Sequence, residues 1–199
     1  MKLYYTKGSC SFVPHVALRE VGADFDLISV DLREKKLADG SDFLAVNPKG
    51  YVPMLERDDG KRIAECAAIL QYVADQNPAS GLAPEAGTDE RYELQEWLSF
   101  VGGELHKGLP PLFMPYIPEE MRPVARARLT VRMDFLNQAL AGKEWLMNDG
   151  FTVADAYCGG ILNWTERAEY GLSEHPNVEA YYDRFCARDS VKAARDAEG

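Results

Sequence analysis

The alternating strand and helix patterns that open this chain stop near residue 77, and only helical patterns follow. Residues 2–6 and 25–32 have the apolar or alternating patterns of strands, and residues 11–21 between them have helical spacing. A strand, a helix and a second strand in this order indicate a parallel strand pair, because that connection needs a crossover. The chain therefore opens as an α/β domain.

The rest of the first segment extends this pattern to β-α-β-α-β-β-α. Residues 41–46 predict a short helix, and residues 47–65 predict two short strands around the turn sequence Asp58-Asp59-Gly60. Residues 66–76 have the apolar spacing of a helix. The following stretch, 77–88, has the composition of a linker.

Every later segment is predicted to be helical. Thr152 and Asp155 have the spacing of a capping box, which predicts a structural helix start. The expected helices are 89–108, 119–141, 153–169, 177–187 and 190–196. We therefore expect an α/β domain over residues 1–80 and an all-helical domain over residues 88–199.

The composition argues against several classes of function. The 199 residues are 46% hydrophobic and carry a formal net charge of −10, so they can bury a core but offer no basic surface to nucleic acid. The N-terminal residues lack the apolar stretch of a targeting signal, and no run approaches the roughly 18–20 apolar residues of a membrane span. We expect a cytoplasmic protein with neither nucleic acid nor membrane as a partner.

Cys10 is the first candidate functional residue. The other cysteines are at positions 66, 158 and 186; the spacings fit neither a zinc site nor a CxxC motif, so we expect reduced thiols and no metal. Cys10 follows the first strand and starts the helix over 11–21, where unpaired N–H groups favour a thiolate. It is either a structural cysteine or a reactive one. Because position 13 is Val, we expect a reactive Cys10 to take its partner from outside, as a small thiol.

Two further positions each have two interpretations. Val52-Pro53 is either an ordinary trans bond at a strand start or a cis bond that leaves the Val52 backbone facing outward, able to pair with an extended peptide. Glu65 lies at the start of the helix over 66–76. Its carboxylate either stabilises that helix or accepts a hydrogen bond from a ligand ammonium.

Taken together, these residues resemble a cytosolic glutathione S-transferase, and specifically the bacterial beta class. The resemblance extends from residue 1 to about residue 187. Five motifs carry it in order: MKLYYTKGSCSFVPHVALREVG, NPKGYVP, AECAAILQYVAD, EWLSFVGGELHKG and FTVADAY. It implies a thioredoxin-like N-terminal domain, an all-helical C-terminal domain, a homodimer, and a hydrophobic substrate pocket between the domains.

The resemblance also implies a glutathione site. In the first domain, Cys10 would lie near the glutathione sulfur, the Val52 backbone beside the cis-proline Pro53 would pair with the cysteinyl part, and the remaining contacts would come from Glu65, Cys66 and Lys35. Glu65 and Cys66 would hold the γ-glutamyl end, and Lys35 would bind the glycine carboxylate.

The helical domain would supply the rest of the site. His106 would be the second catalytic group, hydrogen-bonding near the sulfur, with Lys107 adjacent. Ser99, Gly103 and Glu104 match positions at which family members reach glutathione, partly across the dimer interface. Two glycines within a helix cost roughly 1 kcal/mol each against Ala, which indicates close approach of a backbone or a ligand. The candidate walls of the substrate pocket are Phe113, Met114, Tyr116 and Trp164.

Four positions depart from the family pattern. Cys66 stands where Ser or Gly is common, so its thiol is expected near Cys10, and a redox pair between them is an alternative role. Gly103 offers no hydroxyl, and Ser99 replaces a longer amide. Lys7, where Pro is usual, adds a cation that would favour a thiolate.

Three functions remain open at this point. The first is conjugation of reduced glutathione, as co-substrate, to hydrophobic electrophiles, with detoxification as the expected role. The second is glutathione-dependent thiol–disulfide exchange through a mixed disulfide on Cys10. The third is a glutathione-binding or docking module without turnover, because a fold does not fix a function.

Overall fold

The chain forms two compact units. The structure, a computed structural model, describes residues 1–147 and 150–199. The first unit combines Met1–Ser80 with Asp189–Gly199, and the second comprises Gly81–Arg188.

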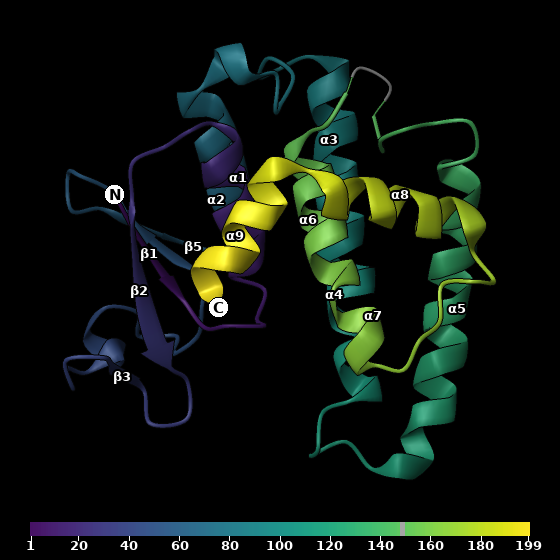
Figure 1. Ribbon diagram of the computed structural model, residues 1–199, viewed down its shortest axis with the longest axis horizontal. Helices are drawn as coiled ribbons and strands as arrows, with labels where there is room; N and C mark the ends of the chain where they lie inside the picture. The colour runs from purple at the N-terminus through teal and green to yellow at the C-terminus, as the bar shows by residue number, and fades with distance from the viewer. Residues whose placement is uncertain (148–149) are drawn as a thin grey trace. The chain divides into compact units, whose positions relative to one another are not determined.

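A five-stranded mixed sheet is the centre of the first unit (Figure 1). Its order is β3-β2-β1-β4-β5, with β1 and β2 parallel and every other neighbouring pair antiparallel. The strands are β1 (Lys2–Tyr5), β2 (Asp26–Asp31), β3 (Lys36–Leu37), β4 (Met54–Glu56) and β5 (Arg62–Ala64). The parallel pair and the β4–β5 hairpin confirm the predictions. The sequence did not predict β3, whose two residues pair with Val30 and Asp31.

Helices and a buried cluster cover this sheet. The helices α1 (Phe12–Glu20) and α2 (Cys66–Gln76) pack against each other, as Figure 1 shows. The predicted short helix over 41–46 is a single 3-10 turn, η1 (Phe43–Ala45). Its Phe43 joins Tyr4, Val30, Val52 and Met54 in one core cluster. Strand alternation places Leu3, the neighbour of Tyr4, on the opposite face, where it is also fully buried.

The last helix, α9 (Asp189–Glu198), belongs to the first unit because it packs against α1. His15 is fully buried, and its Nδ1 lies 2.9 Å from the Glu198 carboxylate. Arg19 donates to the other ring nitrogen of His15 at 3.3 Å, and Ser190 bonds to Glu20. The sequence assigned residues 88–199 to one helical domain, because helical periodicity does not specify which helix a segment contacts.

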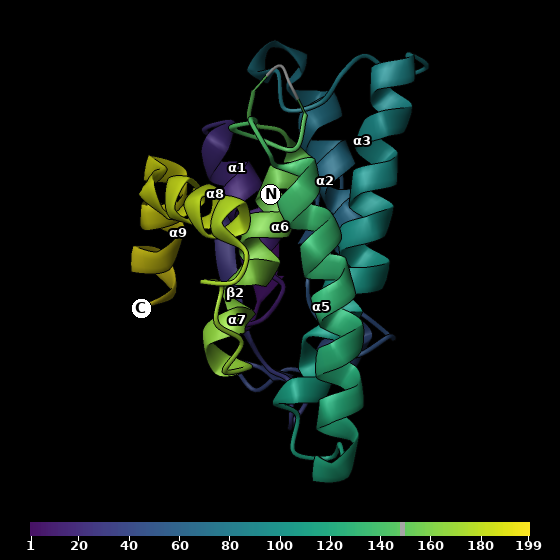
Figure 2. The same ribbon diagram turned by 90° about the vertical axis from the view of Figure 1, so that its right-hand side faces the viewer.

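The second unit is helical, as expected (Figures 1 and 2). Its helices are α3 (Asp89–Phe100), the π-helical turn η3 (Val101–Leu105), α4 (His106–Gly108), α5 (Arg122–Ala139), α6 (Val153–Leu162), α7 (Trp164–Arg167) and α8 (Pro176–Ala187). Three 3-10 turns complete the described elements of the chain: η2 (Pro78–Ser80), η4 (Pro110–Leu112) and η5 (Glu119–Met121). No described helix is both long and apolar enough to cross a bilayer.

The core of the second unit is α6, which packs against α3 and α8 and is buried at every residue. Its first turn contains the predicted capping box. The Thr152 hydroxyl accepts a hydrogen bond from the backbone, and the Asp155 carboxylate accepts from Thr152 N–H at 2.8 Å. The structural role inferred for this motif is therefore confirmed.

Two predicted helices are interrupted. The segment 89–108 changes to a π-helical turn at Val101, where the backbone of Gly102 lies against Tyr157. A Cβ on Gly102 would lie 3.2 Å from the Tyr157 hydroxyl. The segment 153–169 divides at Asn163 into α6 and α7. Periodicity alone predicted continuous helices because these breaks depend on residues distant in the sequence.

Candidate active site

Cys10 lies in the tight turn that joins β1 to α1. Ser9 and Ser11 fix this turn. The Ser11 hydroxyl accepts from Thr6 N–H at 3.1 Å, donates to the Thr6 carbonyl at 3.2 Å and lies 2.7 Å from the Ser9 hydroxyl. Cys10 is half-buried and precedes the first helical residue, Phe12, by two positions. The thiol is therefore held beside the N-terminus of α1, where the sequence placed it.

The Cys10 thiol reaches the segment that contains the predicted proline. Its Sγ donates to the Val52 carbonyl at 3.5 Å, and the Val52–Pro53 bond is cis. Cys66, the first residue of α2, donates from its own Sγ to the Cys10 carbonyl at 3.5 Å. Residues 10, 52 and 66 thus meet after the end of β1, before the start of β4 and after the end of β5, and neither cysteine is in a disulfide.

Glu65 is next to this group in a conformation unusual for its side chain. Its φ is +75°, in the left-handed region that non-glycine residues rarely occupy and that often marks functional sites. Its carboxylate does not cap α2. It accepts instead from Lys49 Nζ at 2.7 Å and from the Tyr51 hydroxyl at 2.6 Å.

These two hydrogen bonds have electrostatic consequences. The bond to Glu65 raises the pKa of the Lys49 ammonium, and the same carboxylate raises the pKa of the Tyr51 hydroxyl. Glu65 therefore already binds a protein ammonium at the position predicted to bind a ligand ammonium. Lys49 and Tyr51 were not assigned roles from the sequence, although both belong to the quoted motif NPKGYVP.

Lys35 is held on the same unit by the loop before β4. Its Nζ donates to the Gly50 carbonyl at 2.7 Å, and its own φ is +56°. Gly50 has φ +69°, and a Cβ there would lie 3.1 Å from Leu44 and 3.6 Å from the Lys35 side chain. Glycine at position 50 thus lets the lysine stem lie close to the backbone.

In the second unit, His106 is the centre of an aromatic cluster. Its Nδ1 lies 2.8 Å from the Tyr157 hydroxyl, and its ring packs edge-on against Trp164 with centroids 5.1 Å apart. Trp164 in turn contacts Phe113 with centroids 6.0 Å apart. The hydrogen bond with Tyr157 orients the imidazole, a role the sequence did not assign although Tyr157 ends the motif FTVADAY.

The remaining predicted glutathione contacts of this unit lie on and around the π-helical turn. The Ser99 hydroxyl donates to the Gln95 carbonyl at 2.7 Å, and Gly103 is exposed. Glu104 forms an ion pair of 2.6 Å with Arg132, whose guanidinium lowers the pKa of that carboxyl.

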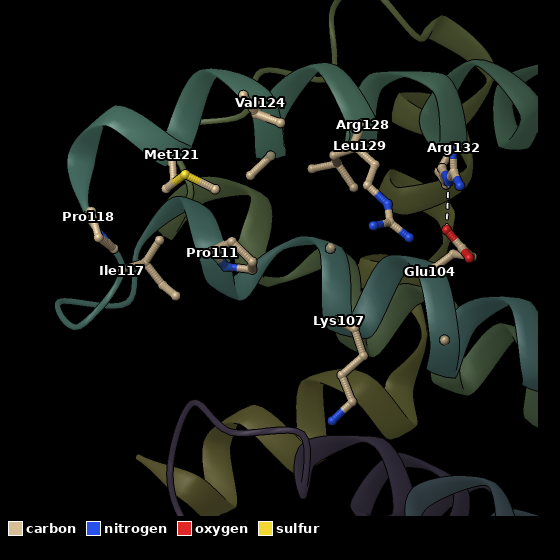
Figure 3. Close-up of a pocket in the computed structure, with 13 residues that line it drawn as sticks. Glu104, Lys107, Pro111, Ile117, Pro118, Met121, Val124, Arg128, Leu129 and Arg132 are labelled. Atoms are coloured by element: carbon tan, nitrogen blue, oxygen red, sulfur yellow. Dashed lines mark hydrogen bonds and ion pairs between the residues drawn. The ribbon is translucent and has the colours of Figure 1, made fainter.

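A groove of about 490 Å³ lies between this turn and α5 (Figure 3). Gly103, Glu104 and Lys107 all line it. Its far end is apolar, with Ile117, Pro118 and Met121, and its near end carries the Glu104–Arg132 pair. None of the predicted substrate walls lines this groove.

The four predicted walls of the substrate pocket differ in their surroundings. Phe113 and Trp164 lie in the cluster around His106, and Met114 is half-buried beside the η4 turn, donating from its backbone to the Pro110 carbonyl at 2.9 Å. Tyr116 is 74% exposed. Tyr116 is therefore the predicted wall with the least support from packing.

No cluster of three or more His, Cys, Asp or Glu side chains with the arrangement of a metal site occurs among residues 1–147 and 150–199. The groups gathered in the two units are a thiol at a helix start, an acid at a helix start and an imidazole with a hydroxyl partner. These are groups that bind a peptide-like thiol and stabilise its thiolate.

Comparison with known proteins agrees with this chemistry. Residues 1–75 match the glutathione S-transferase N-terminal domain, and residues 100–189 match the glutathione S-transferase C-terminal domain. The chain therefore belongs to the glutathione S-transferase family.

Individual relatives match over nearly the whole chain. The glutathione S-transferase GstA of Escherichia coli O157:H7 is 43% identical over 199 residues, covering 100% of this chain and 99% of that protein. A bacterial beta class glutathione S-transferase of Sphingomonas chungbukensis is 45% identical, with a TM-score of 0.96 over 100% of this chain and 99% of the other. A sphingomonad glutathione S-transferase complexed with glutathione is 44% identical, with a TM-score of 0.95 over the same shares of the two chains. The predicted family and fold class are confirmed.

Proposed function

We propose that this protein is a glutathione S-transferase that conjugates reduced glutathione to hydrophobic electrophiles. The observation that carries the proposal is the contact of Cys10 with both Val52 and Cys66, with the Glu65 carboxylate adjacent in sequence. Cys10, Val52 and the Glu65–Cys66 pair are far apart in the sequence. They were assigned to the glutathione sulfur, its cysteinyl backbone and its γ-glutamyl end. The relatives above, which carry the name glutathione S-transferase, support the same function.

The tripeptide binds in a defined direction. The γ-glutamyl ammonium replaces Lys49 on the Glu65 carboxylate, and the γ-glutamyl carboxylate accepts from the backbone at Cys66, the start of α2. The cysteinyl backbone pairs with Val52 as an added strand. The glycine carboxylate accepts from Lys35, which exchanges its bond to the Gly50 carbonyl for a charged partner.

This binding places the glutathione sulfur near Cys10 and the N-terminus of α1, whose unpaired N–H groups stabilise a thiolate. His106, oriented by Tyr157, supplies the second hydrogen bond near the sulfur. The thiolate forms a carbon–sulfur bond to the electrophilic carbon, and the leaving group departs with the electrons of the bond that breaks. Phe113 and Trp164 supply apolar contacts to the electrophile, with Met114 and Tyr116 as further walls.

Thiol–disulfide exchange is a second candidate function, favoured by the half-buried Cys10 thiol itself. The Cys10 thiolate attacks one sulfur of a disulfide, the disulfide bond breaks, and the other half leaves as a thiolate. A glutathione thiolate then attacks the sulfur bonded to Cys10, forming a new disulfide with that sulfur and releasing the Cys10 thiolate. The Cys66 thiol, 3.5 Å from the Cys10 carbonyl, is a possible resolving group in this chemistry.

The first test compares the native protein with Cys10→Ala and Cys186→Ala, using a generic aryl halide for conjugation and a glutathione mixed disulfide for exchange. We expect the native protein to catalyse conjugation. Cys10→Ala should keep a measurable conjugation rate, because the attacking sulfur belongs to glutathione, and should lose exchange. Cys186→Ala, which removes a half-buried thiol from the helical unit, should behave as the native protein.

Other outcomes decide between the functions. No conjugation by the native protein, together with exchange that depends on Cys10, would contradict the transferase proposal and support the second function. Retention on immobilised glutathione without either reaction would support a binding or docking module.

We propose that the protein is a homodimer and that an exposed aromatic face of the second unit contributes to the interface. Trp97 and Phe100 of α3 contact Phe135 of α5, with ring centroids 6.0 Å and 5.1 Å from it. Phe135 is 50% exposed and its neighbour Val131 is 57% exposed. Contiguous exposed apolar side chains of this kind mark association surfaces.

This proposal predicts that Phe135→Glu shifts the protein from dimer to monomer, measured by light scattering after gel filtration at micromolar concentration. A buried carboxylate without a partner opposes association. Lys192→Glu, which adds negative charge on the exposed face of α9, is the control and should leave the dimer unchanged. A native monomer, or a dimeric Phe135→Glu, would contradict the assignment of this face.

A cytoplasmic location is also part of the proposal. All four cysteines are free thiols in the structure, as expected in a reducing compartment.

A further inference from the structure

We propose that the helical unit carries an anion site for a phosphate group, separate from the residues assigned to glutathione. The site is a pocket of about 400 Å³ between the start of α5 and the end of α7. Three arginines line it: Arg122, Arg126 and Arg167. We call it the arginine pocket; Leu112, Phe113, Ala168 and Glu169 complete its lining.

The fold holds these arginines in place. Arg122 and Arg126 are four residues apart on α5 and so share one helix face. Arg126 Nη2 donates to the carbonyls of Ala168 and Glu169, at 3.3 Å and 3.2 Å. The guanidinium of Arg167 lies 4.5 Å from the Phe113 ring centroid. Two guanidinium groups are thus positioned by protein contacts before any ligand binds.

Arg122 gives an independent indication of a ligand. Its Nε is buried, and no described residue accepts a hydrogen bond from it. A buried charged donor without an acceptor is costly, on the order of 1–3 kcal/mol or more, so a ligand that accepts from it recovers part of that cost on binding. Arg122 therefore presents a donor that an anionic ligand can satisfy.

The charge balance points the same way. The chain has 32 acidic and 22 basic residues, yet within residues 1–147 and 150–199 no carboxylate forms an ion pair with any of these three arginines. Glu169 is the acidic residue in the lining, so the pocket keeps a net positive charge. In a protein of net charge −10, such a group of arginines is a local site for anions.

The number of guanidinium N–H donors in the arginine pocket favours a phosphate over a carboxylate ligand. Guanidinium groups bind carboxylates and phosphates through paired N–H donors, but one carboxylate has only two oxygens. A phosphate group has enough oxygens to accept from three guanidinium groups at once. The Phe113 ring and the Leu112 region add an apolar wall, which favours an aryl phosphate ester over inorganic phosphate.

Calorimetric titration of the protein at constant ionic strength tests this site with inorganic phosphate, phenyl phosphate and benzoate. We expect saturable binding of phosphate and phenyl phosphate and at least tenfold weaker binding of benzoate. Arg122→Met should weaken phenyl phosphate binding about tenfold, the loss expected for one charged hydrogen bond. Arg128→Gln, which removes a charge from the same helix outside the pocket, should change it less than twofold.

Chemical modification gives a second readout that needs no variant. Phenylglyoxal should modify Arg167 and Arg122 of the native protein, and phenyl phosphate should protect both while leaving the modification of Arg128 unchanged. Protection by phenyl phosphate supports the site whether or not inorganic phosphate protects equally well, because both compounds supply the same phosphate group.

The proposal is overturned if neither phosphate compound binds saturably, if benzoate binds as tightly as phenyl phosphate, or if folded Arg122→Met binds as the native protein does. Because binding rather than turnover is measured, these outcomes are independent of the transferase activity.

Discussion

Asp155→Ala is expected to lower the free energy of unfolding by about 4 kcal/mol, because several buried donors share this one carboxylate. Asp155 is fully buried at the start of α6. It accepts from Leu146 N–H at 2.9 Å, from Thr152 N–H at 2.8 Å, from the Thr152 hydroxyl at 2.9 Å and from the Tyr181 hydroxyl at 3.2 Å. Alanine would leave all four donors without this acceptor.

Chemical denaturation at pH 7 measures the effect. The control is Asp183→Ala, which removes an exposed carboxylate from α8 and should change stability by no more than about 0.5 kcal/mol. If Asp155→Ala loses less than about 1 kcal/mol, the donors have found other acceptors and the interpretation is wrong.

The same residue predicts a pH dependence. Burial raises the pKa of Asp155 from 3.8 to about 6, against the opposing effect of its hydrogen bonds. A raised pKa means that the folded state binds the proton of Asp155 more tightly than the unfolded state does. This proton's contribution to the free energy of unfolding is therefore complete below about pH 4, and it is lost as the pH rises to about 6. The loss is about 3 kcal/mol, from 1.36 kcal/mol for each unit of pKa.

Asp155→Asn isolates this contribution because its amide does not titrate. The difference in unfolding free energy, native minus Asp155→Asn, should fall between pH 4 and pH 7. A difference that stays flat or rises with pH would show that the hydrogen bonds, rather than burial, set the pKa.

Gly159→Ala is expected to destabilise the protein by about 3 kcal/mol or more through overpacking. Gly159 is in the buried helix α6, and an added Cβ would lie 2.3 Å from Cγ of Phe185 on α8. Phe185 is fully buried, so its ring cannot move into solvent. The two helices must therefore separate or the ring must leave its rotamer.

Two variants make this test specific. Gly103→Ala adds a methyl where no atom lies within 4 Å, so it should be neutral or stabilise by up to about 1 kcal/mol through helix propensity. In a double-mutant cycle, Phe185→Leu should recover part of the loss caused by Gly159→Ala. Additive effects of the two substitutions would falsify the proposed clash.

The sequence predicted those elements whose signals are local. Helix α2 begins and ends at the predicted residues because its apolar spacing and its start at Glu65 lie within one short segment. The β1–β2 pair and the capping box at Thr152 were likewise predicted from neighbouring residues. By contrast, β3 has two residues and depends on pairing with Val30 and Asp31, so no periodic pattern marks it.

The same distinction between local and distant signals applies to the candidate active site. The positions of Cys10, Val52 and Glu65 were singled out from helix-start and proline signals, but the bond from Lys49 to Glu65 joins residues 16 apart and has no local pattern. Tyr157 bonds to His106 although the two residues are 51 positions apart in the sequence. The one nearby sequence signal for this contact is the glycine at position 102, where a Cβ would lie close to the Tyr157 hydroxyl. The arginine pocket joins α5 to α7, so the sequence could not show that its charges meet.

The packing of α9 against α1 has a consequence for synthesis on the ribosome. Residues 1–80 leave the ribosome first, and domains generally fold in that order. Yet Glu198, the partner of the buried His15, lies 183 residues further along the chain. The first unit is therefore assembled from two segments distant in the sequence and cannot be completed until residues 189–199 have left the ribosome.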